Sequence, residues 1–530
     1  MTTARAERAV DRAWPLLAVL GAGLFLVAVD ATVLHVALPD LVRQLRPGAA
    51  AQVWIVAIYP LTAAPLLLPF GTLGDRYGRR RVLVAGYVVF GIASLGCAFA
   101  PNVPVLLGFR ALLGCGGAMI MPVTMSLLRE LFPDQRRRRT AIAVCSGIAG
   151  TGSVFGPILG GVLVESWGWR ATFLLNPPVI LAAVVLALRW LPRNPPGRGP
   201  WDAIGAVLAA GGVLGIAFAV GHPGSWTTAV ASGVTGCVLI GLFLRRQRRT
   251  DPPLLDLALF RRPGVRAAVC GVLLVMSTLV GLGLLFAQYL QVVLGLSPTA
   301  AAGWLLLVLG ASAVGSVVTP SLLGRFGNAR VRTVGFAVAA VSLLVPSAGS
   351  AALTSPLLLG CGLTGLGLGM ALALTSSTDT LLSATSADQA GGAAAVEKTG
   401  YELGAGFGTT VFGSLAAAVY AGHLIVPAGV PEPARLLALS GPAQAEAAVS
   451  GLPSRLAGEL LDAARIACTT GLQVSAAVAC GVFLLAAVAL VVGGGLGFIN
   501  KTHQTTPPPT QIPPHPARGA QGVGGNSEQK

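Results

Sequence analysis

Long apolar stretches recur along the chain, and short segments rich in arginine, glycine or proline separate them. A helix needs about 20 apolar residues to cross the hydrocarbon core of a bilayer, so the pattern predicts an all-α polytopic membrane protein with about 14 spanning helices. We place these helices at 15 to 38, 52 to 72, 82 to 100, 103 to 128, 140 to 163, 171 to 191, 203 to 221, 227 to 244, 266 to 290, 300 to 322, 331 to 349, 354 to 376, 395 to 420 and 471 to 497.

The composition agrees with a membrane protein. The 530 residues are 54% hydrophobic and only 11% charged, which is too apolar and too charge-poor for a soluble surface. A net charge of +16 would suggest nucleic acid as the partner of a soluble protein, but no basic face with interleaved aromatic residues accompanies it. We therefore expect no nucleic-acid partner, and we assign the basic residues to membrane topology and to contact with anionic lipids. The eight cysteines lack C-x-x-C spacing and lie mostly inside apolar spans, so we expect packing roles rather than disulfides or metal ligands.

Basic residues mark one side of the membrane. If the spans alternate in direction, the arginine-rich segments at 73 to 81, 136 to 139, 189 to 198, 245 to 266 and 325 to 332 fall on the same side as the N-terminus. Lys and Arg concentrate in cytoplasmic loops, so this side is expected to be the cytoplasm. An even number of spans places both termini there, which predicts a multi-pass protein of the cell membrane.

An internal repeat divides the chain. LLGRFGNARV at 322 to 331 is similar to LGDRYGRRRV at 73 to 82, although it is one residue short and lacks the Asp. Two six-helix halves with two extra helices between them explain this repeat, and transporters built from two such halves bind substrate at the interface near the midplane. The expected domains are a cytoplasmic tail at 1–14, an N-terminal half at 15–191, a linker with the two extra helices at 192–265, a C-terminal half at 266–501 with an outer loop at 421–470, and a disordered Pro- and Gly-rich tail at 502–530.

The outer loop contains one segment with helical periodicity. Between Leu452 and Ala467, Leu456 and Leu460 have the spacing of one helix face, and Glu459 falls opposite them. An amphipathic hairpin helix on the outer face and a loosely ordered loop both fit this pattern.

Two charged residues lie deep inside apolar spans of the N-terminal half. Asp30 is a candidate for binding a proton or a cationic substrate, because a carboxylate at the centre of a membrane helix costs about 2.5–3.5 kcal/mol and must face a cavity or a partner. The alternative is a packing role through a neighbouring hydroxyl. Arg110 remains charged and must meet a carboxylate, carbonyl groups or water, which makes it a second candidate for a functional role. The alternative is a purely structural ion pair. His35 fits a packing or lining role better than proton transfer.

Three acidic residues are candidates in the C-terminal half. Glu397 and Glu402 lie in a Gly-rich span, and their separation corresponds to about 500° of helix, so they cannot share one face. Asp379, at the inner end of the preceding span, is either a cavity acid or a solvated residue.

Several motifs, spread over almost the whole chain, resemble those of one family. G-x-L-G-D-R-x-G-R-R-R at 71–81 resembles the loop between the second and third helices of the major facilitator superfamily, and R-A-L-L-G-C-G-G-A from Arg110 resembles its fourth-helix motif. G-x-x-x-G-P-x-x-G-G at 152–161 resembles the antiporter signature of its drug exporters. WRATFLLNPPV at 169–179 and A-A-x-V-E-x-x-x-Y-E-L-G at 393–404 resemble segments of the fourteen-helix drug:proton antiporters, including exporters of quaternary ammonium compounds.

The resemblance implies a role for each motif. Arg110 would take part in proton coupling, and the acids at Glu397 and Glu402 would bear on cation recognition. Some relatives carry two adjacent acids where this chain has Glu397 and Lys398, which removes the basis for expecting divalent cations. The loop would act as a gate through Gly74, Asp75, Arg76, Gly78 and Arg79, although its charge alone also fits an ordinary cytoplasmic loop. The fifth span would bend at Gly152, Gly156, Pro157, Gly160 and Gly161, although such spacing alone often serves helix packing.

The expected function is proton-coupled efflux of drugs or antibiotics, chiefly lipophilic cations, by alternating access. The proton gradient would drive it without a cofactor or a metal, and the partners would be a small-molecule substrate, protons and membrane lipids, with the monomer as the functional unit. One rival is an importer or facilitator of a metabolite on the same fold. A membrane enzyme or receptor is disfavoured because H-E-x-x-H, G-x-S-x-G and P-loop motifs are absent from the sequence.

Overall fold

The computed structural model describes residues 14–192, 197, 201–221, 225–250, 253–349, 353–384 and 390–502, apart from the side chains of 390–391 and 493–502. Within these residues, 14 helical segments are long and apolar enough to span a membrane, which confirms the predicted all-α polytopic fold. The predicted tails at 1–14 and 502–530 lie almost wholly outside the described residues. The spanning helices are α2 Leu16–Leu45, α3 Ala49–Tyr77, α4 Arg79–Ala98, α5 Val103–Leu131, α6 Gln135–Trp167, α7 Arg170–Leu174 with α8 Asn176–Trp190, α9 Ala203–Gly221, α10 Trp226–Gln247, α11 Pro263–Gln288 with the π-helical turn η2 Tyr289–Val293, α12 Pro298–Phe326, α13 Asn328–Ser347, α15 Pro356–Ser383, α16 Ala390–His423 and α19 Ser454–Thr502.

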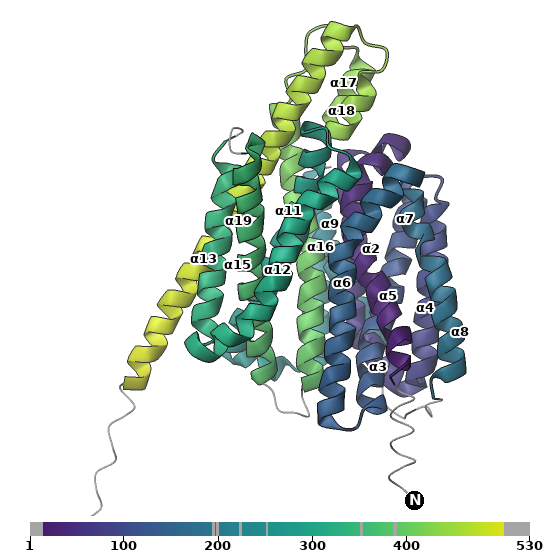
Figure 1. Ribbon diagram of the computed structural model, residues 1–530, viewed down its shortest axis with the longest axis vertical. Coiled ribbons are helices and arrows are strands. Elements are labelled where there is room, and N and C mark those ends of the chain that lie inside the picture. The colour runs from purple at the N-terminus through teal and green to yellow at the C-terminus, as the bar shows by residue number, and fades with distance from the viewer. Residues whose placement is uncertain are drawn as a thin grey trace, which may run out of the picture.

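Two hydrophobic cores organise the bundle into two six-helix halves that stand side by side (Figure 1). Most of the first core comes from α2 to α8, and most of the second comes from α11, α12, α13, α15, α16 and α19. The two halves meet along three helix pairs: α2 with α11, α3 with α16, and α6 with α12. A fold of two halves with two helices between them is thus confirmed.

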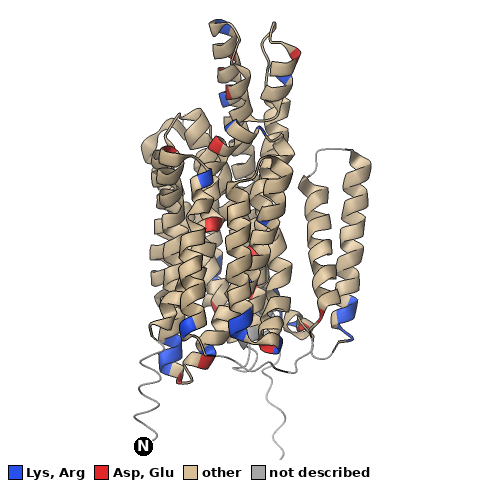
Figure 2. Ribbon diagram, turned by 90° about the vertical axis from the view of Figure 1, so that its right-hand side faces the viewer, with Lys and Arg blue, Asp and Glu red and all other residues tan. Residues whose placement is uncertain are grey.

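The two ends of the bundle differ in charge. Lys and Arg gather at the end where the N-terminus lies, which we call the basic end (Figure 2). The opposite end carries the short helices α17 Glu432–Leu439 and α18 Pro442–Ala448, and we call it the hairpin end (Figure 1). Charged side chains are sparse between the two ends, as a hydrocarbon environment requires (Figure 2).

The internal repeat has the same backbone in both halves. Gly78 ends α3 with φ +95°, and Gly327 ends α12 with φ +79°, a region in which residues with a Cβ are strained. In both turns an arginine lies over the ring of the next residue, since the Arg76 guanidinium is 5.4 Å from the Tyr77 centroid and that of Arg325 is 5.5 Å from Phe326. The sequence similarity therefore reflects a repeated turn.

The two extra helices lie against the interface between the halves. α9 packs on α3 and on α16, and the apolar contacts include Ala57 and Leu61 on α3, Val213 and Ala217 on α9, and Phe407 on α16. α10 packs along α9, with which it is joined at the basic end by an ion pair of 2.8 Å between Arg246 Nε and Asp202 Oδ1. These helices therefore cover one side of the interface.

The outer loop differs from the loosely ordered alternative. α19 begins at Ser454 rather than near 471, because the amphipathic segment before the predicted span continues into it as one helix. The start of α19 packs with α17, α18 and the end of α16 around a small core that includes Tyr420, Ala445, Leu460 and Ala464. The loop is thus an ordered hairpin, and hydropathy alone missed the length of α19 because its first turns carry charged residues.

The interface between the halves is closed at the hairpin end and open at the basic end. On α6, a Cβ added to Gly161 would lie 2.8 Å from Thr299 Cα of α12, and Thr299 Oγ1 donates to Glu165 Oε2 at 2.6 Å. Nearer the basic end of the same helix, a Cβ added to Gly147 or Gly150 would meet nothing within 4 Å. The structure is therefore a state that faces the basic end.

Close packing of α11 on α16 yields a stability prediction. A Cβ on Gly408 would lie 2.2 Å from the Ser277 carbonyl oxygen, so Gly408→Ala should lower the unfolding temperature through an overpacking cost of about 1–3 kcal/mol. Gly303→Ala on α12, where a Cβ meets nothing within 4 Å, is the control and should be neutral or stabilising. Thermal unfolding of the purified variants tests this, and equal unfolding temperatures would contradict it.

Candidate functional site

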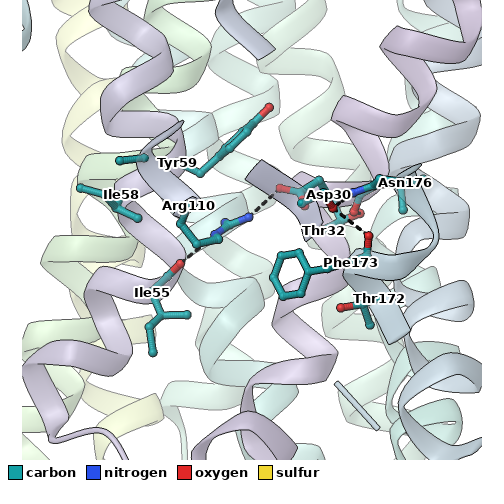
Figure 3. Close-up of polar contacts among 12 residues, drawn as sticks. Asp30, Thr32, Ile55, Ile58, Tyr59, Arg110, Thr172, Phe173 and Asn176 are labelled. Carbon is teal, nitrogen blue, oxygen red and sulfur yellow. Dashed lines mark hydrogen bonds and ion pairs between the residues drawn. The ribbon is translucent and has the colours of Figure 1, made fainter. Parts of the chain in front are cut away.

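A buried ion pair joins two helices of the N-terminal half (Figure 3). Arg110 Nη1 on α5 lies 2.6 Å from Asp30 Oδ2 on α2, and the two side chains are 2% and 1% exposed. Arg110 Nε also donates to the Ile55 carbonyl of α3 at 3.1 Å, and the guanidinium lies 5.2 Å from the ring centroid of Tyr59. One arginine thus ties α2, α3 and α5 together at mid-height of the bundle.

The central cavity lies beside this pair, between the two halves. Eight helices line it: α2, α3, α5 and α6 of one half face α11, α12, α15 and α16 of the other. Most lining side chains are apolar, such as Phe286, Leu305 and Met370. Arg110 borders the cavity, whereas Asp30 lies behind it, so the direct cavity contact expected of Asp30 is not present in this conformation. The physical reason is the arginine, which takes the carboxylate as its partner.

Glu402 is the one carboxylate among the described residues that line the central cavity. It is 6% exposed and projects from α16, next to the lining residue Tyr401. His35 faces the same space from α2, and its Nε2 has no hydrogen-bond partner among the described residues. The hydroxyl of Tyr59 is likewise buried without a partner in that part of the chain. These groups give a mostly apolar cavity an acid and two unpaired polar atoms, beside the Arg110 guanidinium.

Glu397 and Asp379 lie outside this cavity. Glu397 accepts a hydrogen bond of 2.7 Å from Thr378 Oγ1 of α15, so the two glutamates of α16 face different directions as the 500° separation requires. Asp379 is exposed, and it accepts a hydrogen bond of 2.7 Å from Asn328 Nδ2 at the basic end. Of its two alternatives, the solvated one applies, because its place near the end of α15 lets the carboxylate reach water.

The predicted gate forms a polar cluster within the N-terminal half. Arg79 Nη2 lies 2.9 Å from Asp75 Oδ1, and Arg79 Nη1 lies 3.1 Å from Glu130 Oε2 of α5. Gly74 lets α3 approach α5, since an added Cβ would lie 3.0 Å from Val123 Cγ2. In this conformation the basic end is open, and the cluster joins only helices of one half, namely α3, α4 and α5.

The glycine motif of the fifth span has two packing partners. A Cβ at Gly152, Gly156 or Gly160 would lie within 2.7 Å of an atom of α2, whereas Gly161 faces α12 of the other half. Pro157 is inside α6 and lines the central cavity. The motif therefore sets how closely α6 approaches α2 and the opposite half.

The segment after the glycine motif anchors the hairpin end of α2. Trp169 is fully buried, its backbone N–H donates to Asp40 Oδ2 at 3.0 Å, and its indole Nε1 donates to Gln44 Oε1 at 3.0 Å. Asn176 Nδ2 donates to Ser94 Oγ at 2.9 Å. This motif holds α2, α4, α7 and the start of α8 together and does not contribute to the cavity lining among the described residues.

The hairpin contacts the N-terminal half. Arg43 Nη1 of α2 lies 3.7 Å from Glu446 Oε2 of α18, and Gln52 Nε2 of α3 donates to the Ser440 carbonyl at 3.1 Å. Burial raises the pKa of the Glu446 carboxyl above its usual range, and the nearby Arg43 and Arg465 oppose this rise. An acidic medium at the hairpin end therefore protonates Glu446 more readily than an exposed glutamate and weakens its attraction to Arg43.

Comparison with known proteins identifies the family. The sequence profile of the Major Facilitator Superfamily matches residues 20–409. The chain belongs to the major facilitator superfamily.

The multidrug efflux pump LfrA of Mycolicibacterium smegmatis is 38% identical over 495 residues, covering 92% of this chain and 97% of that protein. The methyl viologen resistance protein SmvA of Salmonella typhimurium is 35% identical over 486 residues, covering 90% of this chain and 98% of its own. A bacterial homologue of the human lysosomal transporter Spinster shares the fold with a TM-score of 0.64 at 17% identity, over 91% of this chain and 98% of its own.

As a major facilitator, the protein is a multi-pass membrane transporter and not an enzyme. The sequence identified Asp30, Arg110 and Glu402 from charge in apolar spans, but it missed Tyr59 and Tyr401. An aromatic hydroxyl inside a long apolar span is the signal that points to such residues, and it is weak because tyrosine also packs in ordinary helix interfaces.

Breaking the buried pair yields a second prediction. Asp30→Asn leaves the Arg110 guanidinium buried without a carboxylate, so the variant should lose about 3–5 kcal/mol of stability. The double variant Asp30→Asn/Arg110→Gln removes both charges and should recover much of that loss. Thermal unfolding of the two variants of this major facilitator in detergent compares their stabilities. A double variant no more stable than Asp30→Asn would show that the unpaired charge of Arg110 is not the cause of the loss.

Closure at the hairpin end yields a third prediction. Gly161→Val places side-chain atoms against the Thr299 backbone, so it should destabilise this closure and shift the population toward a state open at the hairpin end. Gly147→Val on the same helix, where space is open, is the matched control. Alkylation of a cysteine placed at Gln291, whose Nε2 donates to the Val36 carbonyl across the interface, should speed up only in Gly161→Val. Equal rates in the two variants would show that the glycine does not control closure.

Proposed function

We propose that this transporter exports drugs or antibiotics, chiefly lipophilic cations, in exchange for protons by alternating access. The observation that carries the proposal is the central cavity, which lies between the halves, is mostly apolar, contains Glu402 and is closed at the hairpin end. An apolar cavity with one acid suits a lipophilic cation, because the carboxylate offsets the charge and the walls remove apolar surface from water.

The basic end is assigned to the cytoplasm. Arg79, Arg80 and Arg81 lie in this end, and Lys and Arg concentrate in cytoplasmic loops. The described residues contain 14 candidate spans, which is an even number, so both termini are proposed to be cytoplasmic, in the cell membrane. The structure then represents the state that loads cargo from inside the cell.

Proton coupling is proposed to rest on competition at Glu402. A single carboxylate can neutralise either a proton or a cationic group, so the two bind in turn. Arg110 is proposed to couple this exchange to the conformation, because it borders the same cavity and holds Asp30. Protons entering down their gradient would drive cargo out without a cofactor, and each charge that crosses adds about 2.3 kcal/mol per 100 mV of membrane potential.

The change of access requires the halves to rock. The contacts of Gly161 and Glu165 with Thr299 would part at the hairpin end, while the basic end closes. The cluster of Asp75, Arg79 and Glu130 is proposed to hold the basic end shut in that second state. Each chain contains its own cavity, so the monomer is proposed as the functional unit.

The names of the relatives support export of drugs. LfrA is named a multidrug efflux pump, and SmvA is named for resistance to methyl viologen. Both relatives cover at least nine-tenths of this chain. This support favours an exporter over an importer on the same fold.

Export by everted vesicles tests the function. Wild-type protein should accumulate ethidium in acid-loaded everted vesicles and release protons from them as it does so. Glu402→Gln should slow transport of this cation by at least about tenfold, the effect of losing roughly 1.4 kcal/mol of interaction, and should affect a neutral substrate far less. Glu397→Gln, on the same helix but outside the cavity, is the control and should keep most of the activity. Transport in the opposite direction would show that the protein is an importer. A wild-type rate in Glu402→Gln would show that this acid takes no part in the mechanism.

A further inference from the structure

A second cavity lies under the hairpin, and we call it the hairpin chamber. Its walls include Gln52 of α3, Gln288 of α11, Ala417 and Tyr420 of α16, and Cys468 of α19. Its roof is the turn between α17 and α18, from Leu439 to Pro442. Both halves of the transporter therefore contribute to it.

The hairpin chamber continues the line of the central cavity toward the hairpin end. On α3 the central cavity is bordered by Val56 and Tyr59, and the chamber by Gln52 and Val53, which precede them in the direction of the hairpin end. The same order holds on α2 and α16, and on α11 the two linings overlap at residues 284–286. A compound that leaves the central cavity toward the hairpin end along the interface of the halves therefore meets the chamber.

The chemistry of the chamber differs from that of the central cavity. No Asp, Glu, Lys or Arg is among the described residues that line it. Its polar side chains are neutral: the amides of Gln52 and Gln288, the hydroxyls of Ser440 and Tyr420, and the thiol of Cys468. The Tyr420 hydroxyl donates to the Ala438 carbonyl at 3.0 Å. The chamber thus offers apolar contact and neutral hydrogen-bonding groups, without the counter-charge that Glu402 provides.

The roof is held by bonds between the halves. Gln52 Nε2 donates to the Ser440 carbonyl at 3.1 Å, and Gln444 Nε2 donates to the Pro47 carbonyl. Gln444 Oε1 is buried without a hydrogen-bond partner among the described residues, and it lies against Gly441 of the roof. Separation of the halves at the hairpin end would break these bonds and open the chamber outward.

We propose that the hairpin chamber is a second binding site, which holds flat apolar or aromatic compounds on their way out. This inference rests on the proposed export function. Binding there depends on apolar contacts and on neutral hydrogen bonds, so a cation is held more weakly than beside Glu402. Cargo passes from the tight acidic site to the weaker neutral site, and opening of the roof releases it.

A pair of substitutions on adjacent residues tests the chamber. Ala417→Phe fills it, whereas Ala418→Phe adds the same ring to the exposed face of α16. Ala417→Phe should slow ethidium export by about tenfold while its affinity for ethidium at the central cavity, measured by fluorescence polarisation, stays within about twofold of wild type. Ala418→Phe should match wild type in both. Normal export by Ala417→Phe, or an equal loss in both variants, overturns the proposal.

Cys468 provides a direct readout of occupancy. In a variant that retains only Cys468, saturating ethidium should slow alkylation by a small maleimide, and the protection should persist when Glu402→Gln is added. A second variant that retains only Cys480 is the control and should show no protection, because Cys480 lies on the same helix as Cys468 but outside the chamber, with its thiol donating to the Ala340 carbonyl of α13. Unchanged alkylation of Cys468, or a thiol that never reacts, overturns the chamber as a site. If wild-type protein exports no ethidium at all, the proposed function fails with it, whereas export without protection of Cys468 refutes the chamber alone.

Discussion

The buried pair of Asp30 and Arg110 is the constraint on which the N-terminal half depends. Both charges lie where a bilayer offers no water, so each can remain ionised only beside the other. The arginine also uses the Ile55 carbonyl and the face of Tyr59, and three helices are thereby held in register at mid-height. Arg110 also borders the central cavity, so the ion pair with Asp30 fixes the position of this part of the cavity wall.

Glycines determine how closely the helices pack, because they let backbones approach one another where the bundle closes. Within each half they make permanent contacts, as at Gly408 against Ser277. Gly161 differs, since its close contact with Thr299 joins the two halves, and no comparable packing holds Gly147 on the same helix. The close contact between α6 and α12 is thus at the hairpin end, while Gly147 and Gly150 toward the basic end meet nothing within 4 Å. This difference is what the proposed rocking of the halves about the cavity requires.

The sequence predicts the helices well because their boundaries depend on local hydropathy. It also identifies Asp30, Arg110 and Glu402, since charge inside an apolar span is conspicuous. It cannot tell that Arg110 rather than Asp30 faces the cavity, because the direction of a side chain depends on how helices rotate against one another. Helical periodicity marks the amphipathic segment at 452–467, but it cannot tell that this segment is ordered and continues into α19, because that depends on the packing of its apolar face with α17 and α18.

The charges around the central cavity limit what a single exchange can carry. Glu402 offsets one positive charge, because Asp30 is already neutralised by Arg110. Exchange of one proton for one monovalent cation then moves no net charge across the membrane. A pH difference alone drives such an exchange, because the membrane potential acts only on an exchange that moves net charge. A dicationic cargo needs a second carboxylate, and Asp30 is the other acid that the described part of the bundle buries beside the cavity. It becomes available only when Arg110 finds another partner, so in the proposed exchange the bond that stabilises the N-terminal half also sets the charge that one cycle carries.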